Sequence, residues 1–307
     1  MISNTTVRAD AGRALLLIVL AAVLWGTVGV ATKALYGLSE TNPLSIGFFR
    51  LAISVPALAL ACWLTLGRRM LQIAPRDLLL MLLIGAAMAL YQVCYFAAIA
   101  LVGIAVAVLV TLCTAPVLVV LLSAGLLHER LTTSVGLALL CALIGTPLLV
   151  GARPDGGLSQ QTMIVGVLLA LVAAFGYAVL TLSSRALAGR YHPLQPLTVG
   201  FASGALLLLP FALATGFVVR YSPAGWALLL HLGLLPTALA YLLFLAGMRH
   251  TTATVASIVT LIEPLTATAL AWMLFGEQLG AAGLLGALLL LGAIGLLYQG
   301  EARRARA

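Results

Sequence analysis

Residues 96–131 read FAAIALVGIAVAVLVTLCTAPVLVVLLSAGLLHERL, and residues 244–279, 148 positions later, read FLAGMRHTTATVASIVTLIEPLTATALAWMLFGEQL. The two stretches align without a gap, and the shared positions include Phe96, Ala98, Ala105, Pro116, Glu129 and Leu131, which recur as Phe244, Ala246, Ala253, Pro264, Glu277 and Leu279. Matches of alanine and leucine are expected in so apolar a chain, but phenylalanine, proline and glutamate are scarce in it. Their common offset predicts an internal tandem repeat.

The repeat continues upstream at a slightly larger offset. Residues 43–48, PLSIGF, correspond to residues 196–201, PLTVGF. Still further upstream, Trp25, Lys33, Ala34 and Leu35 correspond to Tyr177, Arg185, Ala186 and Leu187. We therefore predict two repeats of similar length, residues 1–153 and residues 154–307.

The composition identifies the solvent in which these repeats fold. Hydrophobic residues make up 63% of the chain and charged residues only 8%, and the mean hydropathy is +1.19. Such a chain has too little polar surface to cover a water-soluble globule, whereas lipid requires none. The sequence predicts an integral membrane protein.

Ten apolar stretches are long enough to cross a bilayer, which takes about 20 residues per helix. They are residues 14–35, 43–66, 78–101, 104–127, 134–152, 162–184, 196–219, 226–248, 252–275 and 281–298. Their length and their glycine content favour helices over barrel strands, which would be about ten residues long and alternating. Between the third and fourth stretches, Val102 and Gly103 alone must turn the chain.

The positive charges predict the orientation. With the N-terminus in the cytoplasm, three positive residues lie on the external side, namely Lys33, Arg153 and Arg220, and Arg50 is left inside a helix. Twelve lie on the cytoplasmic side: Arg8, Arg13, Arg68, Arg69, Arg76, Arg130, Arg185, Arg190, Arg249, Arg303, Arg304 and Arg306. We expect both termini in the cytoplasm, in a bacterial-type inner membrane. The net charge of +8 then reflects topology and does not indicate nucleic-acid binding.

Five helices per half is an odd number, so the second half enters the bilayer from the side opposite to the first. The fold prediction is thus an all-α membrane protein of ten helices in two inverted repeats. Inverted repeats are typical of secondary transporters, in which two similar halves open a central site alternately to each face.

Other classes of protein find little support. All four cysteines, Cys62, Cys94, Cys113 and Cys141, fall within predicted helices, which argues against a disulfide framework and against a thiolate metal site. The chain contains no phosphate-binding loop, HExxH or GxSxG motif. We expect no metal, no cofactor and no enzymatic activity.

The repeated motifs resemble a known family. They run from Tyr95-Phe96-Ala97-Ala98 through Thr114-Ala115-Pro116 to His128-Glu129-Arg130-Leu131, and from Phe244 through Ile262-Glu263-Pro264 to Gly276-Glu277-Gln278-Leu279. Their order and spacing, over nearly the whole chain, resemble the EamA-type members of the drug/metabolite transporter superfamily. Within it the chain is most similar to bacterial exporters of aromatic amino acids. The resemblance implies a ten-helix transporter.

Two prolines indicate where a substrate binds. A proline inside a helix frees the carbonyl four residues earlier, here Leu112 for Pro116 and Thr260 for Pro264. Helices interrupted at corresponding places in two halves are a good indicator of a central site. The alternative is that both prolines are ordinary kinks whose freed carbonyls are bonded by neighbouring hydroxyls.

Glu263 is expected near the middle of its helix, where an unpaired charge is costly, and its counterpart in the first half is Ala115. Three roles remain open: a carboxylate that takes up protons and couples export to proton entry, a partner for a substrate ammonium, or a structural acceptor for backbone loosened by Pro264.

Arg50 is expected about 10 Å below the outer surface, because it follows Pro43 by seven residues. It either binds a substrate carboxylate near an outer gate or extends its long side chain back to the lipid headgroups.

Other aromatic and polar side chains complete the candidate site. Tyr91 and Tyr95 share one helix face because they are four residues apart, and Gln92 is adjacent to Tyr91. The full set of candidate substrate-binding residues is Trp25, Tyr91, Gln92, Tyr95, Thr111, Tyr177, Tyr241, Ser257, Thr260 and Glu263, with Arg50, Glu263, Pro116 and Pro264 as coupling or gating residues. An apolar pocket with a few polar groups suits a large neutral amino acid. Packing of each tyrosine between helices is the alternative.

The sequence therefore predicts a secondary transporter that exports small metabolites, in particular aromatic and other neutral amino acids, with protons as a candidate coupling ion and lipid as its surroundings. An exporter of drugs or lipophilic cations, in which Glu263 binds the cation, is the first alternative. A membrane-embedded enzyme or a scaffold is an alternative of another class. The glycine-rich final helix suits a monomer and a homodimer equally.

Overall fold

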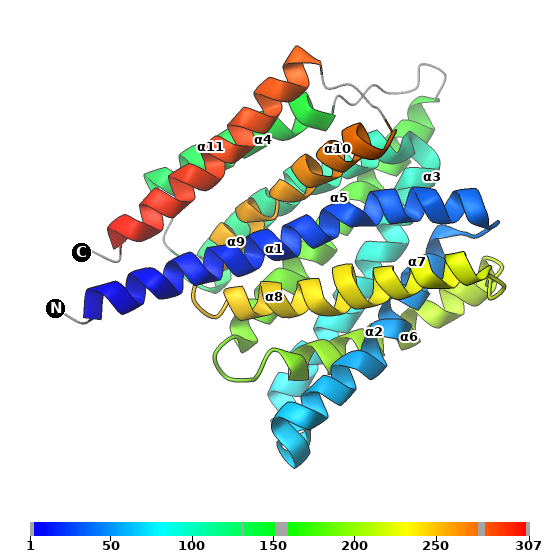
Figure 1. Cartoon of the computed structure of the whole chain (residues 1–307), viewed down its shortest axis with the longest axis horizontal. Coiled ribbons are helices and arrows are strands. Elements are labelled where there is room, and N and C mark those ends of the chain that lie inside the picture. Colours follow the sequence, from blue (N-terminus) through cyan, green and yellow to red (C-terminus); the bar gives the residue numbers. More distant parts are fainter. Residues whose placement is uncertain (1–2, 130–131, 151–158, 276–279, 305–307) are drawn as a thin grey trace.

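The computed structural model of the chain describes residues 3–129, 132–150, 159–275 and 280–304, and helices occupy almost all of these ranges. Figure 1 shows them as one bundle, with both termini at the same end. In chain order the elements are α1 (Ser3–Leu38), α2 (Pro43–Leu66), the 3-10 turn η1 (Gly67–Leu71), α3 (Pro75–Leu126), α4 (Thr133–Val150), α5 (Gln160–Leu187), α6 (Leu194–Ala214), α7 (Pro223–Gly233), the π-helix η2 (Leu234–Leu239), α8 (Ala240–Gly247), α9 (Ala253–Val259), α10 (Ile262–Phe275) and α11 (Ala281–Arg304).

Local sequence explains several helix starts. Asn42 precedes α2, and its side chain accepts a hydrogen bond from the Ser45 amide at 2.8 Å. Ser159, Ser222 and Thr252 cap α5, α7 and α9 in the same way. Such caps satisfy amide groups that a helix leaves without partners in its first turn.

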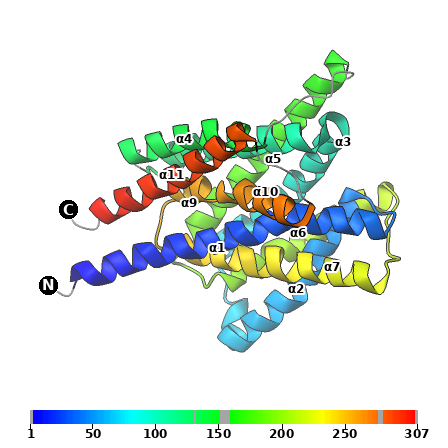
Figure 2. The ribbon, with the colours of Figure 1, turned by 45° about the horizontal axis from the view of Figure 1, so that its top comes forward.

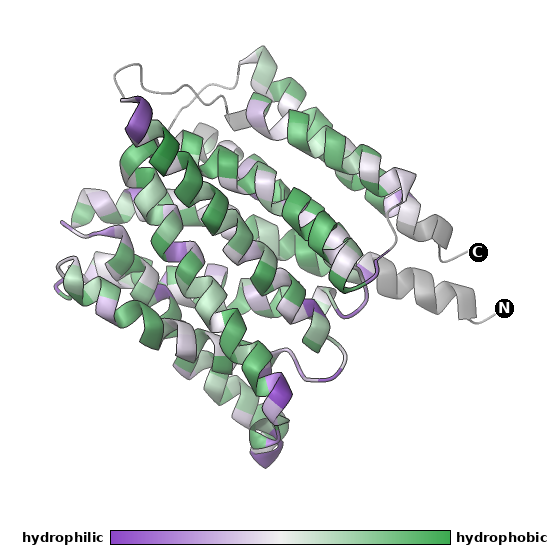
Figure 3. Cartoon of the chain, turned by 180° about the vertical axis from the view of Figure 1, so that it is seen from behind, coloured by the Kyte–Doolittle hydropathy of each residue, from purple (hydrophilic) through white to green (hydrophobic). Residues whose placement is uncertain are grey.

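The helices form a membrane protein with ten spans, as predicted. Nine stretches of the described helices are long and apolar enough to cross a bilayer, and Thr133–Leu148 of α4 is a shorter tenth. One of the nine runs from α7 through η2 to α8, and another from α9 into α10. Figure 3 shows an outer face that is largely hydrophobic, with hydrophilic residues gathered toward the ends of the helices.

Helix α3 contains two of the predicted spans because it folds back on itself. Gly176 of α5 faces the backbone of Ala87 and Tyr91, while its near neighbour Ala178 shares an apolar cluster with Val119. Residues 87 and 119 of α3 therefore lie at the same level of α5, which a straight helix could not achieve. The predicted turn at 102–103 is thus a sharp bend within α3, and the helical pattern continues through it.

The packing of the helices follows a regular scheme. Helix α1 packs against α8 and α10, and α5 packs against both arms of α3. Helix α2 packs against α6, and α4 packs against α11. The α4–α11 pair lies along one flank of the bundle in both ribbon views (Figures 1 and 2).

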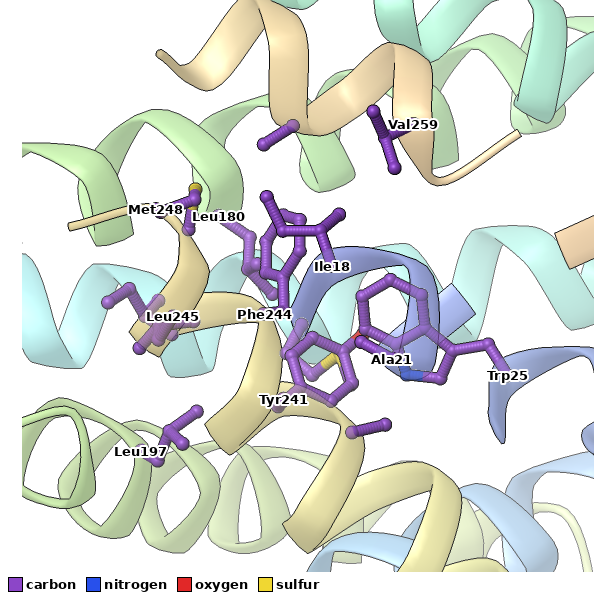
Figure 4. Close-up of a cluster of buried hydrophobic side chains, with 14 of the residues drawn as sticks. Ile18, Ala21, Trp25, Leu180, Leu197, Tyr241, Phe244, Leu245, Met248 and Val259 are labelled. Atoms are coloured by element: carbon purple, nitrogen blue, oxygen red, sulfur yellow. The ribbon is translucent and has the colours of Figure 1, made fainter. Parts of the chain in front are cut away.

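A large apolar core lies where α1 meets α8. The Trp25 ring lies 4.8 Å from the Tyr241 ring and 5.3 Å from the Phe244 ring, measured between centroids. Figure 4 shows these rings with Ile18 and Ala21 of the same α1 face. Trp25 and Tyr241 also border the cavity described below, so the core supports the wall of the site.

Glycines allow α3 and α6 to cross in close contact. A Cβ added at Gly85 would collide with the Gly200 carbonyl oxygen and the Ser203 Oγ, and would lie 2.8 Å from the Gly204 amide. Because most of these atoms belong to backbone, they have little freedom to move away.

We expect Gly85→Ala to lower the free energy of unfolding by about 1 to 3 kcal/mol, the usual cost of overpacking. Gly29→Ala in α1 is the matched control, because a Cβ at Gly29 meets nothing within 4 Å. Thermal unfolding of both variants in detergent measures the difference. Equal melting temperatures would show that the α3–α6 crossing tolerates an added methyl group.

Candidate functional site

A cavity of about 90 Å³ lies inside the bundle. Water needs roughly 10 to 15 Å³ of such space per molecule, so the cavity admits a small organic molecule or several waters. Ten of the thirteen predicted site residues line it: Trp25, Arg50, Tyr91, Tyr95, Thr111, Pro116, Tyr177, Tyr241, Thr260 and Glu263. The prediction missed seven further lining residues: Val28, Thr32, Ile46, Phe96, Leu112, Ala115 and Leu261.

On α1 and α2 the cavity extends toward the end of the bundle that is remote from the termini. On α1 the lining residues fall in the second half of the helix, and on α2 they fall in the first two turns. On α3 they lie on both sides of the bend near Val102. On α5 and on the span from α7 to α8, by contrast, Tyr177 and Tyr241 lie nearer the ends on the side of the termini, the left side of Figure 1.

The predicted helix 252–275 is broken, which changes the position of Glu263. Helix α9 ends at Val259 and α10 begins at Ile262. The reason is Pro264, which has no N–H to offer the Thr260 carbonyl. That carbonyl accepts the Glu263 amide instead, at 2.9 Å. Glu263, expected near the middle of its helix, thus lies in the first turn of α10.

The first turn of a helix suits a carboxylate, because the helix dipole is positive there. Helix α1 comes close to this turn through Gly26, where a Cβ would lie 3.0 Å from the Glu263 carbonyl oxygen. In the first half, by contrast, Pro116 lies within the uninterrupted arm of α3. The two prolines therefore break their helices unequally, although the sequence predicted similar breaks.

Arg50 is buried and does not extend to the headgroups, so that alternative is wrong. Its side chain is 9% exposed, and Nε donates a hydrogen bond to the Thr237 Oγ1 at 3.3 Å. Thr237 in turn donates to the Leu232 carbonyl at 2.7 Å. Within the described residues, Nε is the one guanidinium nitrogen of Arg50 that donates to protein.

Arg50 and Glu263 border the same cavity but are not joined by an ion pair in the part of the chain that the structure describes. The Glu263 carboxylate likewise accepts no hydrogen bond from another described group. A cavity with one cation and one anion that do not bond to each other can bind a molecule that carries both charges.

Aromatic rings form much of the remaining wall. Tyr91 and Tyr95 are stacked, with centroids 5.5 Å apart and planes at 15°, and Tyr177 lies 6.3 Å from Tyr91. The Tyr177 hydroxyl donates to Thr260 at 3.4 Å. The Trp25 Nε1 is buried and has no hydrogen-bond partner among the described groups. Such a wall offers apolar surface together with a few donors.

Three predicted residues do not line the cavity. Gln92 is 1% exposed and faces Gly47 of α2, whose added Cβ would lie 2.8 Å from the Gln92 Oε1. The Ser257 hydroxyl donates to the Thr254 carbonyl of its own helix at 2.9 Å. Pro264 of α10 is buried. Gln92 and Pro264 are next to lining residues in sequence, whereas Ser257 lies three residues before Thr260.

Polar contacts close the bundle at the end that carries the termini. Arg190 donates to Asp77 at 2.7 Å, and the Tyr191 hydroxyl donates to the other oxygen of Asp77 at 2.9 Å. In the connecting loop between α5 and α6, burial and then the neighbouring Arg249 charge lower the pKa of His192.

A second set of contacts at this end joins the two halves of the sequence. The Glu129 carboxylate accepts the Ala253 and Thr254 amides at the start of α9, at 2.9 and 3.2 Å. It also lies 3.8 Å from the Arg185 Nε, and Arg185 donates to the Met248 carbonyl at 3.0 Å.

No group of three or more metal-ligating side chains gathers anywhere in the described ranges. The repeat partner of Glu129, Glu277, lies outside the described residues.

Comparison with known proteins gives consistent matches. The family model described as EamA-like transporter family matches twice, at residues 12–151 and 164–299. The uncharacterized transporter YwfM of Bacillus subtilis is 34% identical over 94% of this chain and 94% of its own length. The pseudopaline exporter CntI of Pseudomonas aeruginosa is 28% identical over 90% of this chain and 92% of its own. A solved crystal structure, 24% identical, covers 96% of this chain and 99% of its own with a TM-score of 0.81, and supports the fold alone.

Proposed function

Since the chain belongs to the EamA-like transporter family and is a multi-pass membrane transporter, we propose that it exports aromatic and other neutral amino acids. The observation that carries this proposal is the cavity, in which a buried guanidinium and a carboxylate stand apart between aromatic rings. An amino acid presents one carboxylate, one ammonium and a side chain, and each has a complementary group here.

The binding mode follows from these groups. The Arg50 guanidinium binds the substrate carboxylate, and the Glu263 carboxylate binds the ammonium. The stacked Tyr91 and Tyr95 rings and the Trp25 ring accept an aromatic or aliphatic side chain. Trp25 Nε1, buried without a partner, is available to a polar atom of the substrate or to a water.

The two repeats supply the alternating access. The packing scheme supports an exchange of halves: α1 against α8 and α10 corresponds to α5 against the two arms of α3, while α2–α6 and α4–α11 pair each helix with its own counterpart. The double match of the family model supports the same division. Inverted halves of this kind can exchange conformations and open a central site to either side.

The structure suits one particular stage of this cycle. The α1 and α2 wall of the cavity extends toward the end remote from the termini, and the Asp77 and Glu129 contacts close the other end. With the termini in the cytoplasm, as the positive charges indicate, the cavity faces outward across the inner membrane. This is the stage at which an exporter releases its substrate.

Protons are the proposed coupling ion. A substrate ammonium and a proton compete for the same Glu263 carboxylate, because a neutral carboxyl group no longer attracts a cation. Release of the substrate to the outside therefore favours proton uptake, and the proton returns to the cytoplasm when the next substrate binds. This exchange drives export against a gradient.

Efflux from proteoliposomes tests the proposal directly. We expect vesicles loaded with labelled tryptophan or threonine to release it through the protein when an inward proton gradient is applied. Tetraphenylphosphonium, a lipophilic cation, should compete weakly, because the buried Arg50 disfavours a cation that has no carboxylate. Vesicles without protein are the control.

An exporter of lipophilic cations is the second candidate, favoured by the aromatic wall around Glu263. Strong competition by tetraphenylphosphonium together with slow efflux of both amino acids would support that function and contradict ours.

A further inference from the structure

The π-helix η2, Leu234–Leu239, lies in the middle of a membrane span and is not explained by the fold alone. Turns of π-helix are rare and occur frequently at functional sites. Here the irregularity has a local cause. Pro236 has no N–H, so the Leu232 carbonyl four residues earlier loses its usual helical partner.

The hydroxyl of Thr237 replaces the missing donor. It donates to the Leu232 carbonyl at 2.7 Å, and Thr237 is fully buried. A hydroxyl has one hydrogen and two lone pairs. Because the hydrogen is already directed to Leu232, Thr237 can meet a further group only as an acceptor.

Arg50 supplies the matching donor. Its Nε donates to the Thr237 Oγ1 at 3.3 Å. The guanidinium is planar, so a bond at Nε restrains the orientation of the whole group. With Nε occupied, the two terminal nitrogens are the pair that remains for a bidentate contact with a carboxylate.

The repeat-related pair of helices, α3 and α6, shows that this arrangement is not required by the fold. At the repeat offsets, Ser203 corresponds to Arg50, and Met88 and Ala89 correspond to Pro236 and Thr237. That segment of α3 is ordinary α-helix. Pro236, Thr237 and Arg50 thus occur together in one pair of helices, and the corresponding positions of the other pair have no proline, threonine or arginine.

We propose that Thr237 is the positioning residue for Arg50, holding its guanidinium so that the two terminal nitrogens bind the substrate carboxylate. Thr237 thereby makes the site selective for substrates that carry a carboxylate. This inference rests on the proposed function, because it needs a zwitterionic substrate in the cavity.

The test compares tryptophan with tryptamine, which has the same ring and ammonium but no carboxylate. For Thr237→Val, which keeps the shape but loses the hydroxyl, we expect the apparent affinity for tryptophan to fall about tenfold. The affinity for tryptamine should change less than about twofold, because tryptamine does not use Arg50. Thr237→Ser, which restores the hydroxyl, should behave like the unmodified protein. Binding is measured with the full chain in proteoliposomes.

Coupling to Arg50 is tested in the same assay. In an Arg50→Met background, Thr237→Val should cause no additional loss of tryptophan affinity, since the two residues act as one unit. If Thr237→Val does not fold, Thr237→Cys replaces it, because a thiol is a weak acceptor.

Three results would contradict one or both proposals. Equal losses for tryptophan and tryptamine, or additive losses in the double variant, would overturn the positioning role of Thr237 and leave the transport function intact. No saturable binding of tryptophan to the unmodified protein would overturn the proposed function and this inference with it.

Discussion

Glu263→Gln is expected to reduce efflux driven by a proton gradient strongly while leaving exchange of substrate across the membrane. The amide cannot take up or release a proton, so the gradient no longer acts on the cavity. Its carbonyl oxygen can still accept a hydrogen bond from an ammonium, so a substrate still binds, although more weakly. Loss of the charge should lower the initial rate of gradient-driven efflux by about 100-fold, the size expected for a desolvated charge contact.

Two assays on the same vesicles measure this effect. Efflux under an inward proton gradient reports coupling, and exchange of labelled for unlabelled substrate without a gradient reports binding and movement. Glu40→Gln is the control, because Glu40 is an exposed carboxylate between α1 and α2. Gradient-driven efflux that persists in Glu263→Gln would remove Glu263 from the coupling step.

The number of spans could be predicted from the sequence because the bilayer imposes it. A spanning helix needs a fixed length of apolar residues, and polar segments mark the ends of each stretch. The bend in α3 was harder to predict, since residues 99–106 are apolar throughout and a helical reversal there leaves no polar mark. The form of the break between α9 and α10 could not be predicted from Pro264 alone, because a proline in a membrane helix can produce a kink, a bend or a restart.

Much of the lining of the cavity could also be predicted, for one physical reason. Polar and aromatic side chains within an apolar span are costly on the lipid side, so they collect around an interior cavity. This argument does not apply to a hydroxyl that donates its hydrogen bond to a carbonyl of its own helix. Ser257 bonds to the Thr254 carbonyl and needs no cavity, and the same local bond can form at any serine in a helix.

Gln92 shows a second reason why the residues lining the cavity could not all be predicted from the sequence. It is adjacent to Tyr91 in sequence, but successive residues of a helix point about 100° apart, and Gln92 faces Gly47 rather than the cavity. Which of several polar faces lines a cavity depends on the packing of the other helices, and one sequence does not contain that information directly.

Thr237 was not among the predicted residues, although a signal for it was present. A proline frees the carbonyl four residues earlier at Pro236, as it does at Pro116 and Pro264. At Pro236 this is the Leu232 carbonyl, and the adjacent threonine is the natural donor. The partner of that threonine, Arg50, lies 187 positions away in sequence, so the contact itself required the structure.

Arg50→Met is expected to lower the apparent affinity for tryptophan by about 30-fold to 1,000-fold, that is by about 2 to 4 kcal/mol. The guanidinium supplies two charge-assisted hydrogen bonds to the substrate carboxylate in a desolvated cavity, and methionine supplies none. Affinity for tryptamine should remain or increase, because the variant removes a positive charge that repels the ammonium. The ratio of the two affinities, measured by competition in proteoliposomes, is the quantity to compare.

The fold should survive this change, because methionine has a similar length and replacing a buried charge by an apolar group of similar size is often neutral for stability. Arg50→Lys is the matched variant: it keeps the charge but loses the planar pair of donors, and its affinity for tryptophan should lie between those of the unmodified protein and Arg50→Met. If Arg50→Met bound tryptophan as the unmodified protein does, the carboxylate would have to contact other donors, such as the Trp25 Nε1. The selectivity assigned to Arg50 and Thr237 would then be wrong, whereas the transport function could stand.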